Sequence, residues 1–132
     1  MPETITTIPV GCFNQCTSLF KEEFSSAASV NYAVEKFFKN ITTVLNMSFT
    51  GVPIIDLIIP DKMQVLGYRC FRNMKKLTTV TINSTSLIYE DCGADIFEGN
   101  TNTLTKATVP AQYNTAEWTA KFKFDINNIH YI

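Results

Sequence analysis

One feature limits what this chain can fold into more than any other: a phrase of apolar residues that occurs four times. Each copy has an aliphatic residue, then a Phe, then a second apolar group spaced L-x-x-φ-x-φ, where φ is apolar. The aliphatic residues Val44, Leu66 and Ile88 are 22 residues apart, and Ile54 precedes Leu77 by 23 residues. Fixed periods of this size are typical of solenoids. The equivalent aromatic residues are Phe13, Phe49, Phe71 and Phe97.

The repeat also predicts how one coil packs on the next. The second apolar group forms a short strand that points into a shared interior, and the Phe returns to the same interior from the opposite wall. One coil cannot bury its apolar side alone, so neighbouring coils must stack. We therefore expect an α/β-type repeat solenoid of about four coils with short parallel strands, in which the four Phe side chains are buried and aligned.

Two insertions interrupt the repeat. The first, at 25–40, contains a sequence that favours a short helix, with Ser29 as its cap. A second, shorter insertion lies within 90–95 and lengthens the fourth copy. The apolar side of the expected helix carries Tyr32, Val34, Phe37 and Phe38.

Three segments, 12–19, 54–60 and 68–82, carry a resemblance to a known family. Together they look like BspA-type leucine-rich repeats, whose phrase is roughly small-Phe-x-x-Cys-x-x-Leu-x-x-Ile-x-Ile-Pro. Cys16 matches the Cys of that phrase, and the segment 109–118 resembles the piece that closes such arrays. The resemblance implies a repeat solenoid that serves in surface adhesion, in binding host proteins or in structural roles. In the other copies the position of Cys16 is taken by Val52, Met74 and Asn100.

The length of 132 residues predicts one domain, 1–132, with a C-terminal cap at about 110–132. Within the cap, 121–126 alternates polar and apolar residues like a strand. The 11 basic and 12 acidic residues give a formal net charge of -1. A nucleic-acid partner would require a basic patch or stripe, so we expect none.

The sequence leaves the location of the protein open. The longest apolar stretch, 52–60, is too short to span a bilayer and contains Asp56. The N-terminus lacks the basic start and apolar core of a signal peptide. We expect no membrane insertion, and a place at a cell surface or on a virion if the protein belongs to an assembly, otherwise in the cytoplasm.

The residues that carry metal or catalytic chemistry are sparse and scattered. Four cysteines offer only one short spacing, Cys12 to Cys16, where a zinc site prefers paired spacings or nearby His. We expect buried reduced thiols, although a disulfide of Cys16 or Cys92 stays open for an extracellular protein. The single histidine, His130, lies in a tail that we expect to be exposed, so a nucleophile has one candidate imidazole base at most. The sequence therefore predicts no enzyme, no cofactor and no structural metal.

The outward side of the strands is the first candidate binding surface. Residues that flank the middle apolar position of each strand alternate away from the interior. They form one mostly polar face of mixed charge, with Ile58 as its apolar exception; a merely solvated face is the open alternative. The residues of this expected binding face are Lys21, Glu23, Asp56, Ile58, Thr79, Thr81, Lys106 and Thr108.

The N-terminal end of the array is the second candidate. The first copy begins at Ile5, and four residues cannot cover a coil, so an apolar end should meet another chain. Alternatively, the helical insertion packs back on the solenoid. The first hypothesis for function is recognition or adhesion through contact with a protein or a glycan; the second is a structural subunit of an assembly such as a virion. The expected docking end comprises Ile5, Ile8, Tyr32, Phe37 and Phe38.

Overall fold

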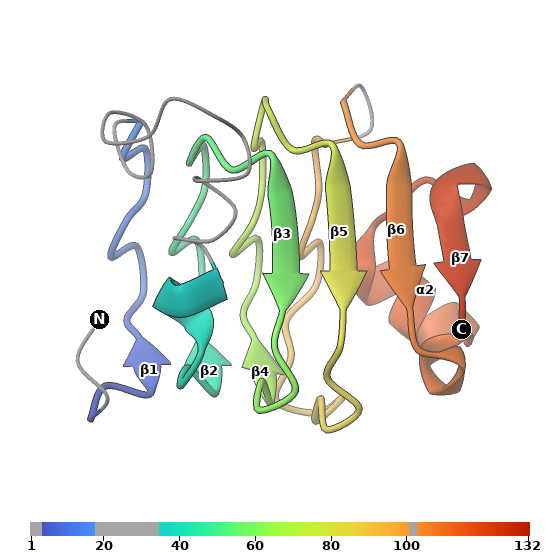
Figure 1. Cartoon of the computed structure of the whole chain (residues 1–132), viewed down its shortest axis with the longest axis horizontal. Coiled ribbons are helices and arrows are strands. Elements are labelled where there is room, and N and C mark those ends of the chain that lie inside the picture. The colour runs from blue at the N-terminus through green and yellow to red at the C-terminus, as the bar shows by residue number, and fades with distance from the viewer. Residues whose placement is uncertain (1–3, 18–34, 101–102) are drawn as a thin grey trace.

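Successive coils of the chain place short parallel strands side by side in two sheets (Figure 1). The computed structural model describes residues 4–17, 35–100 and 103–132. The short-strand sheet has the order β1-β2-β4 and consists of β1 (Thr7–Ile8), β2 (Thr43–Val44) and β4 (Val65–Leu66). The long-strand sheet has the order β3-β5-β6-β7 and consists of β3 (Asp56–Ile59), β5 (Thr79–Ile82), β6 (Lys106–Val109) and β7 (Ile129–Tyr131).

The strands pair in the register that the repeated phrase predicts. Leu57 of β3 lies opposite Val80 of β5, which lies opposite Ala107 of β6. In the short-strand sheet, Val44 lies between Ile8 and Leu66. All of these side chains are buried, because alternate residues of a strand point to the same side and that side is the shared interior.

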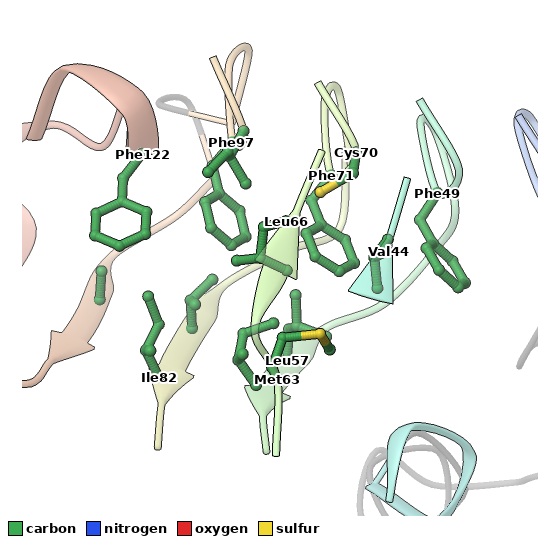
Figure 2. Packing of buried hydrophobic residues seen from close by; sticks show 14 of the residues in the cluster. Val44, Phe49, Leu57, Met63, Leu66, Cys70, Phe71, Ile82, Phe97 and Phe122 are labelled. Atoms are coloured by element: carbon green, nitrogen blue, oxygen red, sulfur yellow. The ribbon is translucent and has the colours of Figure 1, made fainter. Parts of the chain in front are cut away.

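The repeated Phe side chains form one continuous stack, the phenylalanine column, and Figure 2 shows Phe49, Phe71 and Phe97 of this stack. Its ring centroids are 5.2 Å apart between Phe13 and Phe49, 5.6 Å between Phe49 and Phe71, and 5.4 Å between Phe71 and Phe97. The predicted alignment is confirmed. Burial is complete for the last three residues, whereas Phe13 at the end of the stack is only partly buried.

Left-handed backbone brings each Phe into the column. Met47 and Gly51, two residues before and two after Phe49, both have positive φ. The same pair of positions is left-handed around the other three Phe residues of the column. Between these bends, backbone N–H groups donate to the next coil, as from Phe49 N to Cys70 O at 2.9 Å. The wall opposite the strands is thus a hydrogen-bonded ladder of turns.

The fourth copy departs from the expected register. Val65 N donates to Thr42 O and Ile88 N donates to Gln64 O, so Ile88 occupies the place of Val65 and not that of Leu66. Ile88 is accordingly 39% exposed, and its assignment to the buried position is wrong. Cys92 takes the buried position next to Leu66 instead, and its Sγ lies 3.4 Å from the backbone N of Leu66. The longer turn before Cys92 causes the shift.

The C-terminal part combines short helices with the last strand. Its elements are η1 (Ala111–Tyr113), α2 (Ala116–Phe122), η2 (Ile126–Asn128) and β7. The prediction of a strand at 121–126 is wrong. The α2 helix runs to Phe122, and Lys123 ends it in a left-handed conformation. Phe122 and Phe124 are nevertheless buried, and Phe124 extends the column by stacking 4.6 Å from Phe97.

Only the last part of the insertion at 25–40 falls within the described residues. Residues 35–38 are helical there. Phe38 is fully buried and lies 5.1 Å from Phe49 between ring centroids, while Phe37 is partly buried and lies 5.6 Å from Phe13. These two side chains pack back on the solenoid. Ser29, Tyr32 and Val34 lie outside the described residues.

Candidate binding face

Three neighbouring strands place the expected face residues in two straight rows. One row runs from Asp56 through Thr79 to Lys106, and the other from Ile58 through Thr81 to Thr108. Their side chains alternate with buried residues along each strand. The structure therefore brings six of the eight expected residues together on the outward side of the long-strand sheet. Lys21 and Glu23 lie outside the described residues.

Hydrogen bonding fixes part of the first row. The Thr79 hydroxyl donates to a carboxylate oxygen of Asp56 at 2.5 Å, in the range of a charge-assisted hydrogen bond. Lys106, the next residue of the row, is exposed. The row thus presents an oriented carboxylate at one side and an exposed ammonium group at the other.

His130 joins the second row, which the sequence interpretation missed. β7 pairs with β6 so that His130 lies opposite Thr108, and the imidazole side chain is exposed. A signal was available, since the apolar neighbours Ile129 and Tyr131 alternate with His130 as residues of a strand do. The face therefore ends in an imidazole side chain, which can donate or accept hydrogen bonds.

A hollow of about 420 Å³ adjoins the face where β3 ends. Ile58 of the face and Pro60 contribute its apolar lining. The hollow gives the flat rows of the sheet a recess with both an apolar and a charged wall. Its charged and polar lining residues are Glu35, Lys39, Asp61, Lys62 and Asn83.

The expected docking end is largely covered by the chain itself. Ile8 is 1% exposed and Phe38 is 0% exposed, so neither offers surface to a partner. Phe37 packs edge-on to Phe13 and is partly buried. Ile5 alone among the described members remains open, at 41% exposure. Ile8 and Phe38 are buried and therefore do not belong to a docking surface, which corrects their assignment to it.

The model of one protein family, described as BspA type leucine-rich repeat region (6 copies), matches residues 1–51 and 42–131. The chain belongs to this family. Its BspA-type repeats account for the stacked parallel strands, and the family is generally a non-enzymatic protein-interaction module. No curated protein and no solved structure matches the chain.

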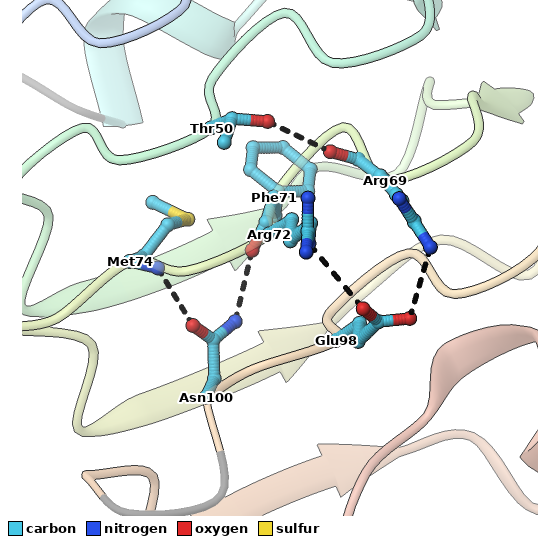
Figure 3. Close-up of polar contacts among 7 residues, drawn as sticks. All are labelled: Thr50, Arg69, Phe71, Arg72, Met74, Glu98 and Asn100. Atoms are coloured by element: carbon cyan, nitrogen blue, oxygen red, sulfur yellow. Dashed lines mark hydrogen bonds and ion pairs between the residues drawn. The ribbon is translucent and has the colours of Figure 1, made fainter.

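The BspA-type phrase also explains the buried Asn100, which takes the place of the Cys in the fourth copy. Its amide oxygen accepts from Met74 N at 2.7 Å, and its amide nitrogen donates to Phe71 O at 2.8 Å (Figure 3). The side chain thereby satisfies two backbone groups of the preceding coil. Beside it, Glu98 forms ion pairs with Arg69 and Arg72.

The four cysteines differ in environment, against the expectation that all are buried. Cys12 and Cys16 are exposed, whereas Cys92 and Cys70, which stands in the same repeat position as Cys12, are buried. Loss of hydration on burial raises the pKa of the Cys70 thiol well above its ordinary value, and the neighbouring Cys92 adds to the shift. Burial likewise raises the pKa of Cys92. Both interior thiols are thus held in the neutral, unreactive form.

Two findings bear on metal and membrane. Within residues 4–17, 35–100 and 103–132, no three side chains of His, Cys, Asp or Glu gather closely enough to hold a metal ion. Across the same part of the chain, no helix is long and apolar enough to cross a membrane.

Proposed function

We propose that the chain is a recognition or adhesion module that binds a protein through the outward face of its long-strand sheet. The observation that carries the proposal is the alignment of side chains across β3, β5, β6 and β7. Repeat arrays use such extended faces for binding, because regular spacing presents many side chains on one rigid support. The family supports a protein-interaction role at this level.

The face suits a partner with mixed polar and charged groups. Hydroxyl groups of Thr81 and Thr108 can both donate and accept hydrogen bonds, and Asp56 and Lys106 offer opposite charges. Ile58 beside the hollow supplies an apolar position that a partner side chain can fill. In this proposal residues 1–132 form a single domain, and 110–132 cap its C-terminal end.

The test is a substitution at the centre of the face. A partner captured with the protein from its native source is purified, and its affinity is measured for the chain and for Thr81→Arg. We expect the long cation to weaken binding by about tenfold or more, since a clash at a rigid centre cannot be avoided by a small shift. Thr85→Arg, at an exposed site beyond the end of β5, serves as the matched control. Equal affinities of Thr81→Arg and the parent chain would overturn the proposal.

A second function, a structural subunit of an assembly such as a virion, is favoured by one observation. Three large apolar side chains near β1 and β2 are exposed: Ile5 at 41%, Val10 at 60% and Met47 at 37%. Apolar groups gathered at one end of an array favour contact with another chain. In sedimentation experiments on the native assembly, Ile5→Lys and Val10→Lys should release the protein. Their unchanged retention would exclude this end as the docking surface.

A further inference from the structure

The first coil exposes positions that the next two coils bury. Four of its residues are open to solvent at least in part, whereas their equivalents in the second and third coils are fully buried. Ile5, for example, is 41% exposed, while Ile41 and Met63 in its place are 0% exposed. The four residues are Ile5, Cys12, Phe13 and Cys16, and together with the exposed Val10 we name them the first-coil surface.

Stacking of one coil on the next is what buries these positions elsewhere. Phe49 and Phe71 each stack on a ring on both sides. Phe13 stacks on Phe49 on one side only, and among the described residues its other ring contact is edge-on to Phe37. The β1 strand likewise lies at the edge of the short-strand sheet (Figure 1). The first-coil surface is thus one half of a coil–coil interface and continues the packing already formed along the array.

The charge of the two ends decides which surface can meet the first coil. The segment 4–17 contains no charged residue, although charged residues make up 17% of the chain. Identical surfaces that meet around a two-fold axis repel each other least when they carry no charge. The exposed hydroxyl groups of Thr6 and Thr7 both donate and accept, so they can bond to the same groups of a second copy.

The opposite end of the array fits the first coil less well. There α2 covers the fourth coil, since Phe97 N donates to Phe122 O. This end exposes the charged side chains of Glu117 and Lys123. A head-to-tail contact would bury these charges against an uncharged surface, and charged residues are depleted from the centre of interfaces. Two first-coil surfaces therefore suit each other better than either suits the C-terminal end.

We propose that two copies of the chain bind each other through their first-coil surfaces around a two-fold axis. The contact covers Ile5 and Val10 and brings Cys12 and Cys16 of both copies to one interface. This inference names a partner for the end that the structural-subunit proposal uses. The outward face of the long-strand sheet stays free, so the dimer presents that face twice and gains avidity for a partner with repeated sites.

Sedimentation velocity of the intact chain tests the proposal. At rising micromolar concentration the chain should reach twice its mass of 14.9 kDa and no more, because a two-fold contact closes on itself. Val10→Glu places like charges in the interface and should weaken the dimer by about tenfold or more. Ile126→Glu, at the other end, is the matched control and should leave the dimer unchanged. Val10 and Ile126 are 60% and 71% exposed, so both variants keep the fold.

The exposed cysteines provide a second measurement of the same contact. A short bismaleimide, which adds one thiol to each of its two rings, should join the two copies through Cys12 or Cys16. Cys70 and Cys92 are buried and therefore protected from the reagent. The cross-linked product should be absent from the double variant Cys12→Ser with Cys16→Ser, which should still sediment as a dimer.

Four results would overturn the proposal: a mass of 14.9 kDa at every concentration, masses that grow beyond two copies, equal weakening by Val10→Glu and Ile126→Glu, or a dimer without the cross-link. The structural-subunit proposal is judged separately. If Ile5→Lys and Val10→Lys release the protein from its native assembly while the isolated chain stays monomeric, that proposal stands and the second copy is excluded as the partner.

Discussion

At the scale of single residues, the structure depends on polar side chains that serve the backbone of a neighbouring coil. Asn100 is 2% exposed and holds the N–H of Met74 and the C=O of Phe71. Replacing it with Leu keeps the approximate size but leaves both backbone groups buried without partners. Such groups cost about 1–3 kcal/mol each when they lose their hydrogen bond. We expect Asn100→Leu to lower the free energy of unfolding by about 2–4 kcal/mol in urea titrations.

Asn100→Asp provides the control for this prediction. The aspartate keeps the acceptor for Met74 N but loses the donor to Phe71 O, and it adds a charge in a buried site. Its destabilisation should therefore decrease at low pH, where the carboxyl group is protonated and can donate again. Stability of Asn100→Leu equal to that of the parent would show that the two backbone groups find other partners.

At the scale of elements, one lysine connects α2 to the turn that lengthens the fourth copy. Lys121 Nζ donates to the backbone carbonyl groups of Tyr89 and Cys92, the latter at 2.7 Å. The same ammonium group lies 3.6 Å from the centroid of the Tyr89 ring. Lys121→Met retains the aliphatic stem but removes all three interactions. We expect faster hydrogen exchange at Asp91 and Cys92 and a loss of about 1–3 kcal/mol in stability, as for hydrogen bonds to charged groups.

Lys123→Met is the matched control, because Lys123 is exposed and has no side-chain contact of this kind within the described residues. Its exchange rates at the turn should equal those of the parent chain. If both variants accelerate exchange alike, the effect comes from the charge of the helix and not from the contacts of Lys121.

The sequence predicted those elements in which the spacing of apolar residues shows directly which positions are buried. The strands and the column follow from Leu57, Val80 and Phe71, because such large apolar side chains at repeated spacing specify the one register that buries them. Left-handed Met47 could not be predicted, since residues other than glycine rarely adopt positive φ. The α2 helix was missed because Lys121 and Phe122 alternate like a strand, while the start of the helix depends on a local cap in which Trp118 N donates to the Thr115 hydroxyl oxygen.

The candidate face was predictable for a similar reason. Asp56, Thr79 and Lys106 each stand beside a buried residue on a strand, so alternation alone assigns them outward. The hollow beside the face was not predictable, because it brings Lys39, Ile58 and Asn83 together from different coils.

At the scale of the whole molecule, the phenylalanine column transmits stability along the array. Phe71 is fully buried, stacks on Phe49 and Phe97, and lies 6.2 Å from Phe38 between ring centroids. Phe71→Ala should cost about 3–5 kcal/mol, the usual range for a buried Phe. The cavity left by the ring would weaken the packing on both neighbouring coils, those of Phe49 and Phe97, so these coils should lose stability together with the coil of Phe71.

Phe13→Ala tests whether coils act as nearest neighbours. Phe13 is partly buried at the end of the column, and a repeat array passes destabilisation mainly to adjacent coils. Unfolding monitored by the fluorescence of Trp118, which packs near the opposite end against Tyr113 and Phe122, should shift strongly in Phe71→Ala and little in Phe13→Ala. Hydrogen exchange at Phe49 N, which donates to the third coil, should accelerate in both variants. Equal shifts of the Trp118 signal would instead mean that the molecule unfolds as one cooperative unit, and that the column couples its two ends completely.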